Sequence, residues 1–336
     1  MTPDSDSSWL KRQFVTVRDD RRQAEARGHP LAGVKTYRYL RIGMLVAVAA
    51  LGYSLVQEHR ASGCWLGSIS GYYYTPVGPV FVGMMVAIAL ALVVIKGRMA
   101  EDVFLTLAGF MAPIVAFLPT TDPTHGADYP SFTGACLNQT WNIHHYRSDA
   151  GDGFLASSTE NNLHALAFAG AVGVTVIVLS YLFAERWRRK SDKKSNVHTE
   201  SELTPGTVIN LALSVVFAIA GVVVVKFHYA WLLDKHAIAA GAMFGLLALA
   251  ALADGVLGIR DDQKKPRICG ALYLVTGATM LVAGAIFWFT DHQPNGHAVI
   301  WIEGIEIALF ATFWLIQTIE RWNFTVTPAP PAAPAA

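Results

Sequence analysis

The sequence predicts an all-α fold, a polytopic transmembrane helix bundle of about eight spans. Of 336 residues, 53% are hydrophobic and only 15% are charged, whereas a soluble chain has about 25% charged residues. Apolar runs of about 17 to 25 residues, enough to cross a bilayer, recur along the chain. They are 42–58, 78–96, 103–118, 163–184, 207–226, 237–258, 269–290 and 298–319.

The distribution of basic residues predicts the orientation, because Lys and Arg stay on the cytoplasmic side during insertion. With eight spans, all but four of the 26 Lys and Arg residues fall on one side of the membrane. The four on the other side are Arg60, Arg147, Lys226 and Lys235. We therefore expect a multi-pass plasma-membrane protein with both termini in the cytoplasm.

The same map predicts the domain boundaries. Residues 1–41 are expected to form a cytoplasmic tail. They are polar and Arg-rich, whereas a cleaved signal peptide has its apolar core within this region. We therefore expect the first helix to remain in the mature protein. The transmembrane domain is 42–320, with halves 42–184 and 207–320, and a disordered Pro/Ala-rich cytoplasmic tail, 321–336, follows. The net charge of +1 indicates that the chain has no nucleic-acid partner. The sequence also contains no nucleotide-binding loop. Membrane lipids are therefore the expected partners.

The polar break at 185–206 separates four helices from four, and the halves show similar helix ends. Helices three and seven end in "LPTTDPTH" and "FWFTDHQ", while helices four and eight open with "NNLHALAF" and "NGHAVIWI". These matches suggest a four-plus-four repeat about an axis along the membrane normal. Chance likeness between apolar helices with polar ends is the alternative.

Histidines gather at the expected outer ends of the helices, with only His29 and His198 on the cytoplasmic side. Imidazoles beside carboxylates suit zinc or a similar divalent metal. The candidate ligands are His228, His236, His292, Asp234 and Asp291. Their spacing matches no metal motif, so solvated interfacial side chains are the alternative.

Cys64 and Cys136 fall in the two large outer loops, where an oxidising compartment allows a disulfide between them. Two unpaired thiols are the alternative.

Three features inside the helices have packing interpretations. Gly241 and Gly245 form a small-xxx-small face for close helix contact. Pro113 is expected to kink its helix and free a carbonyl near Gly109. Asp254 is expected to snorkel from its helix end to the inner surface.

Glu303 and Glu306 are the least expected residues of the last span. They are three apart and so share one helix face, and a charged acid at this depth is unfavourable by about 2.5–3.5 kcal/mol. We interpret them as the floor of an outward-open polar pocket that binds a proton or cation, with His164 and His297 at its rim. Neutral carboxyls that hydrogen-bond neighbouring helices are the alternative.

A second candidate site is the stretch "SISGYYYTPVGPVFVG" at the outer boundary of the second span. Ser68, Ser70 and the following tyrosines can offer hydroxyl groups to a lipid headgroup, with an aromatic belt and a turn as the alternative. With "EDVFLTLAG", "LHALAFAG" and "WIEGIEIALFATFWLIQTI", this stretch resembles a group of uncharacterised bacterial integral membrane proteins, distantly similar to DRAM/Sfk1-like and domain-of-unknown-function membrane families. The resemblance implicates Ser68, Tyr72, His164 and Glu303. It covers roughly 68–122, 163–184 and 298–319.

Three function classes remain from the sequence. The favoured class is a non-enzymatic membrane protein that binds lipid, cation or partner through the outward His/acid pocket. The second is a metal-dependent intramembrane hydrolase acting on lipid, resembling the ceramidase/adiponectin-receptor-like group. The third is a secondary transporter, for which the sequence offers few polar groups at depth besides Glu303 and Glu306.

Overall fold

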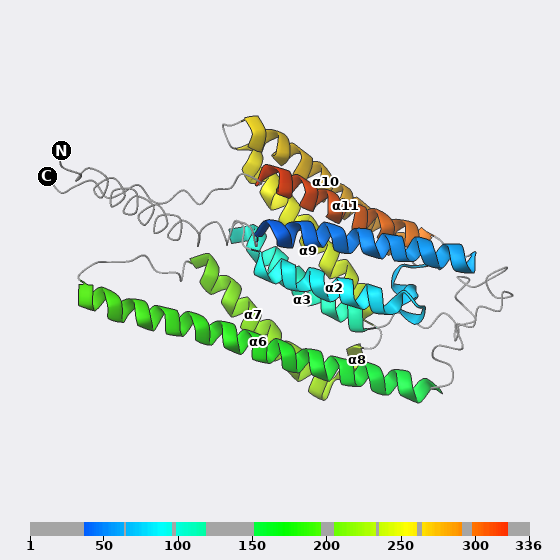
Figure 1. The fold of residues 1–336 in the computed structure, drawn as a ribbon, viewed down its shortest axis with the longest axis horizontal. Helices are drawn as coiled ribbons and strands as arrows, with labels where there is room; N and C mark the ends of the chain where they lie inside the picture. The colour runs from blue at the N-terminus through cyan, green and yellow to red at the C-terminus, as the bar shows by residue number, and fades with distance from the viewer. Residues whose placement is uncertain are drawn as a thin grey trace, which may run out of the picture.

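The computed structural model describes residues 37–63, 65–95, 99–118, 151–195, 205–232, 235–260, 264–290 and 298–321, and these residues contain helices and no strand. The first helix is Tyr37–Ser62. It is followed by the 3₁₀ turn η1 (Ser70–Tyr74) and by α2 (Gly78–Val94), α3 (Met99–Phe117), α6 (Gly151–Ser195), α7 (Pro205–Phe227), α8 (Tyr229–Leu232), α9 (His236–Ile259), α10 (Lys264–Thr290) and α11 (Ala298–Glu320) (Figure 1).

The predicted fold class is confirmed, because a helix covers each of the eight predicted spans. Seven of the described helices are long and apolar enough to cross a membrane. The eighth, α2, has 17 residues, which is at the lower end of spanning length. The chain is therefore a multi-pass helical membrane protein.

Several helices extend beyond their predicted spans. The first helix begins at Tyr37, five residues before the predicted 42. α6 has 45 residues and extends beyond the predicted span 163–184 at both ends, into segments that we expected to be loops. A helix forms its own backbone hydrogen bonds in water as well as in lipid, so it can continue beyond the membrane. Hydropathy therefore predicts which part of a helix crosses the membrane, but it does not predict where the helix begins or ends.

The helices form a main bundle and a side pair. In the main bundle α9 packs against α3 and α10, α2 against α3, and α11 against α10, with the first helix alongside. α6 and α7 pack mainly against each other and meet the bundle through α3. Figure 1 shows them along one side of the molecule, opposite α10 and α11.

The closest contact in the main bundle is made by glycines of α9 and α10. A Cβ atom at Gly270 would lie 2.7 Å from the backbone nitrogen of Ile259, and one at Gly277 would lie 2.8 Å from the carbonyl oxygen of Ala248. By contrast, a Cβ at Gly241 or Gly245 would meet nothing within 4 Å. The prediction that Gly241 and Gly245 form the close helix contact is therefore wrong.

The four-plus-four repeat is not confirmed. α2 pairs with α3 and α9 pairs with α10, as the repeat requires. However, α11 packs closely along α10, whereas α6 has few contacts with α3. The last helices of the two halves therefore occupy different places relative to their partners.

Candidate functional site

Glu303 and the stretch around η1, two separate candidate sites in the sequence, form one polar site. The carboxylate of Glu303 accepts hydrogen bonds from the backbone N–H of Ile69 and from the hydroxyl of Ser70, at 3.2 Å. The Ser68 hydroxyl lies 3.0 Å from that of Ser70 and accepts a hydrogen bond from the N–H of Gly71 at 2.9 Å. Glu303 thus satisfies the free N–H at the start of a helical turn, where an anion is favoured.

Tyr72 belongs to the same turn, but its hydroxyl group contacts the protein's own backbone. Its side chain is buried, and its hydroxyl oxygen accepts a hydrogen bond from the N–H of Leu66 at 3.2 Å. Burial raises the pKa of the Tyr72 hydroxyl. Tyr72 therefore fixes the loop before η1.

Glu306 lies one turn below Glu303 and is 3% exposed. Its carboxyl group lies against Gly284 of α10: a Cβ built on that glycine would be 3.8 Å from Oε1 of Glu306. Neither carboxyl oxygen has a hydrogen-bond partner of normal geometry among the described residues. The two glutamates thus share a helix face, as predicted, but only Glu303 is hydrogen-bonded.

His164 is not part of this site. It lies on α6, with about half of its side chain exposed, 3.8 Å from the carboxylate of Glu160 in the preceding turn. α6 lies on the other side of the bundle from α11 (Figure 1). The expected rim position of His164 is therefore wrong, because the position of α6 within the bundle could not be read from its sequence; His297 lies outside the described residues.

The tentative metal ligands are only partly described. His236 is buried, and its Nδ1–H donates a hydrogen bond of 2.7 Å to the carbonyl oxygen of Leu118, while His228 is exposed after α7. Asp234, Asp291 and His292 lie outside the described residues. Within the described part of the chain no three His, Cys, Asp or Glu side chains come together, so the metal site and the hydrolase that needs it stay predictions.

The predicted disulfide also lies outside the described residues, since neither Cys64 nor Cys136 is among them. It stays a prediction.

A buried charge network lies at the opposite end of the bundle from Glu303. Arg321, just after α11, binds Glu101 of α3 through two nitrogens, at 2.9 and 3.2 Å, and Asp254 of α9 at 3.0 Å. The side-chain amide of Gln317 donates to both carboxylates, at 2.8 Å to Asp254. Glu101, Asp254 and Gln317 are at most 1% exposed, so three helices are joined by charges that lipid and water do not reach.

The network corrects the prediction that Asp254 snorkels to the surface. Its carboxylate is held inside by Arg321 and Gln317, because leaving the bundle would strand a buried guanidinium. Burial alone would lower the pKa of Arg321, but the neighbouring Glu101 and Asp254 carboxylates raise it well above its ordinary value. Arg41 of the first helix adds a second positive charge beside this network, its guanidinium 5.3 Å from the ring centre of Trp314.

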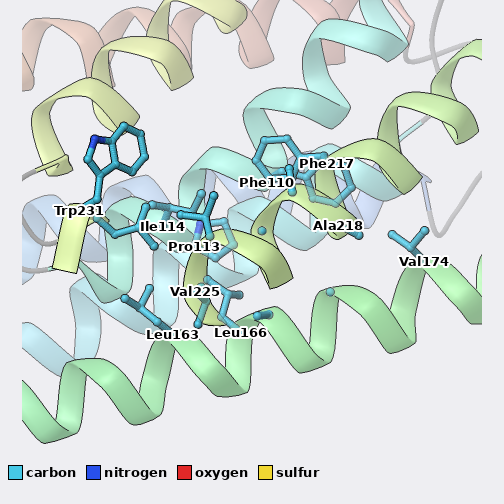
Figure 2. A pocket seen from close by; sticks show the side chains of 16 residues that line it. Phe110, Pro113, Ile114, Leu163, Leu166, Val174, Phe217, Ala218, Val225 and Trp231 are labelled. Atoms are coloured by element: carbon cyan, nitrogen blue, oxygen red, sulfur yellow. The ribbon is translucent and has the colours of Figure 1, made fainter. Parts of the chain in front are cut away.

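A groove lies between α3 and the α6–α7 pair. Its central part has a volume of about 300 Å³. Leu163 and Leu166 of α6 project toward Pro113 of α3 and Val225 of α7 (Figure 2). The lining residues are all apolar: Phe110, Pro113, Ile114, Leu163, Leu166, Ala167, Gly170, Val174, Phe217, Ala218, Ala220, Gly221, Val224, Val225, Trp231 and Leu232.

A second, more polar cavity of about 500 Å³ is lined by α3, α6 and α7 together with the end of α2. Its polar lining residues are Asp102, Thr106, Ser180, Tyr181, Thr207, Asn210 and Ser214. Thr106 lies about one turn from Phe110, and Ser214 about one turn from Phe217, so the two cavities are consecutive along α3 and α7. The two cavities thus lie end to end beside α3, α6 and α7, one lined by apolar residues and one partly by polar residues.

Two specific contacts hold α7 beside α3 along this groove. The amide of Asn210 donates to the hydroxyl of Thr106 at 3.0 Å, and the rings of Phe110 and Phe217 stack with centroids 5.0 Å apart. Among the described residues, α6 packs mainly on α7 and only sparsely on α3. The groove therefore stays open along the side that α6 covers only loosely.

Sequence reasoning missed Glu101, Gln317 and Arg321 of the charge network and all of the groove. Glu101 and Arg321 stand at the ends of spans, where a charge is ordinary and carries no signal. Of the three, only Gln317 could have been recognised from the sequence, because it is a polar residue within the last apolar run. The groove has no signal, because its apolar residues look like those that face lipid.

The chain matches no protein-family model, no curated protein and no solved structure in comparisons with each. The resemblance proposed from the sequence motifs therefore stays a prediction.

Proposed function

We propose that this protein is a lipid-binding integral membrane protein that holds one lipid molecule in the groove between α3 and the α6–α7 pair. The observation that carries the proposal is the order of the two cavities along α3, polar beside Asp102 and apolar beside Pro113. A membrane lipid has the same order of polar and apolar parts. The lipid function predicted from the sequence is thus kept, but at a different place in the fold.

The position of the groove in the membrane fits a lipid of one leaflet. Asp102 is near the start of the α3 span, Ala100–Phe117, so the polar end of the groove lies at the membrane surface. From Asp102 to Ile114 the helix rises about 18 Å. This exceeds half of the roughly 30 Å hydrocarbon core, so an acyl chain fits along the apolar part while its headgroup stays at the interface.

The polar end favours an uncharged or zwitterionic headgroup. Among the described residues, its lining offers hydroxyls, the Asn210 amide and the carboxylate of Asp102, and includes no Lys or Arg. Recognition of an anionic phosphate headgroup relies on such basic residues. We therefore expect lipids with neutral headgroups to be retained in preference to phosphatidic acid or phosphatidylserine.

Filling the apolar part of the groove is expected to remove the bound lipid. Gly170 and Gly221 both line it, and a Cβ at either position meets nothing within 4 Å. The double variant Gly170→Leu/Gly221→Leu should therefore fold normally while its side chains occupy the cavity. Native mass spectrometry of detergent-purified protein should show lipid retention at least about ten-fold lower than in the parent, the change that about 1.4 kcal/mol of lost affinity produces.

Gly173→Leu is the matched control. Gly173 also lies on α6 with no atom within 4 Å of its Cβ position, but it does not line the groove. Its lipid retention should equal that of the parent. Equal retention in the double variant and in Gly173→Leu would overturn the proposed site.

We also propose that both termini are cytoplasmic and that the protein resides in the plasma membrane, on the basis of the basic-residue asymmetry. Reporters fused after residues 100, 195, 264 and 330 should then be cytoplasmic, and reporters placed within 59–77 or 119–162 should be external. Protease protection in right-side-out vesicles measures this directly. An external reporter after residue 195 would contradict the four-plus-four topology.

A further inference from the structure

Four of the ten buried side-chain atoms without a hydrogen-bond partner among the described residues lie on one face of α11. Glu306, Trp314 and Gln317 each have buried side-chain atoms without a hydrogen-bond partner among the described residues. Among them only Glu306 has a titratable group, and neither of its oxygens has a hydrogen-bond partner of normal geometry. A buried polar group without a partner calls for an explanation, because burying it costs free energy that a hydrogen bond would recover.

Glu306 differs in this respect from the other buried carboxylates of the bundle. Glu303 accepts hydrogen bonds from Ile69 and Ser70, and Glu101 and Asp254 share Arg321. Each of these three carboxyl groups thus has a hydrogen-bond or ion-pair partner. Glu306 has no ion pair within the described structure, so its ionised form would be uncompensated inside the membrane.

The charged groups near Glu306 do not supply that compensation. On its own helix the nearest is Glu303, which is itself acidic. The first helix carries Glu58, His59 and Arg60 at its end close to η1, but none of them forms an ion pair with Glu306. α10, which packs against it, carries no Lys, Arg, His, Asp or Glu between Arg267 and Thr290.

A metal cation does not fit this environment either. Ca²⁺ requires about six to eight oxygen ligands and Mg²⁺ about six. The α10 surface beside Glu306 is the backbone of Gly284, and no described group of three His, Cys, Asp or Glu residues lies there. A proton neutralises a carboxylate without further ligands.

We propose that Glu306 is a proton-binding site of this protein, a membrane-embedded carboxyl group at the α10–α11 contact that binds and releases a proton. Access is from the Glu303 side. On the other side the buried rings of Phe310, Phe313 and Trp314 separate Glu306 from the charge network. This site is independent of the lipid groove, which lies on the opposite side of α3.

Labelling with dicyclohexylcarbodiimide tests the proposal in the full-length protein in detergent. The protonated carboxylic acid adds across one C=N bond of the reagent, its proton moving to nitrogen and its oxygen to carbon. The acyl group then shifts to nitrogen, so the whole reagent mass stays on the residue. Peptide mass spectrometry should find Glu306 labelled, at a level that falls as the pH is raised.

The other buried carboxylates are internal controls, because hydrogen-bonded anions react poorly with this reagent. We expect Glu303, Glu101 and Asp254 to be labelled at least five-fold less than Glu306. Glu306→Gln should abolish the label, and Glu303→Gln should keep it. Labelling mainly at Glu303, or undiminished labelling of the Glu306→Gln variant, would overturn the proposal.

Infrared spectroscopy tests the same proposal without a labelling reagent, so it remains informative if dicyclohexylcarbodiimide does not reach Glu306. A pH-difference spectrum should show the C=O stretch of a protonated carboxylic acid, and the band should be absent from the folded Glu306→Gln variant. Because glutamine has the shape of a protonated glutamate, this variant should fold, and Glu306→Asp provides a second, titratable variant with a shifted band. If Glu306 is unlabelled and Glu306→Gln keeps the same spectrum, Glu306 binds no exchangeable proton and the proposal is wrong.

Discussion

Replacing Arg321 with alanine is expected to lower the free energy of unfolding by about 3–5 kcal/mol, the usual loss when one partner of a buried ion pair is removed. Arg321 holds Glu101 and Asp254 together, and both carboxylates would remain buried after the substitution. Two buried carboxyl groups without their cation would then lie side by side between α3, α9 and α11, so at least one of them would have to bind a proton. A thermal denaturation series in detergent should show a fall in Tm of roughly 5–10 °C.

Arg260→Ala is the matched control, because Arg260 follows α9 at the same end of the bundle but is exposed. Its Tm should stay within about 1 °C of the parent, as for most exposed positions. Replacing the network as a whole, with Glu101→Gln, Asp254→Asn and Arg321→Met together, should recover much of the loss because no buried charge remains. A Tm for Arg321→Ala equal to that of Arg260→Ala would show that the network does not stabilise the bundle.

Replacing Gly270 with alanine is expected to destabilise the protein by about 3 kcal/mol, the upper end of the usual range for overpacking. The added Cβ would lie 2.7 Å from the nitrogen of Ile259 and 2.9 Å from the carbonyl oxygen of Gly255. These are backbone atoms of α9, which cannot move aside as a flexible side chain does. α9 and α10 would have to separate along their length.

The same substitution at Gly241 of α9 gives the opposite expectation. No atom lies within 4 Å of its Cβ position, and alanine is favoured over glycine in a helix by about 1 kcal/mol. Gly241→Ala should therefore leave Tm unchanged or raise it, in the same denaturation assay. Equal losses at the two positions would contradict the α9–α10 contact described above.

Hydropathy alone determined the number and positions of the spanning helices. A run of apolar residues long enough to cross a bilayer must form a helix there, because only a helix satisfies its own backbone hydrogen bonds in lipid. The eight predicted spans therefore coincide with helices from the first, Tyr37–Ser62, to α11. The same reasoning identified Glu303 and Glu306 as exceptional, since the cost of an acid in the membrane does not depend on which helix neighbours it.

Only the tertiary structure decided which helix faces meet, because lipid tails and buried side chains are equally apolar and give the sequence no inside or outside. This is why the glycines of the close contact proved to be Gly255, Gly270 and Gly277 in place of Gly241 and Gly245. It is also why His164 lies across the bundle from Glu303, and why Asp254, near a helix end, is buried with Arg321. For the same reason, two glutamates three residues apart on α11 have different surroundings. Glu303 accepts hydrogen bonds from the N–H of Ile69 and the hydroxyl of Ser70, whereas Glu306 lies against the backbone of Gly284.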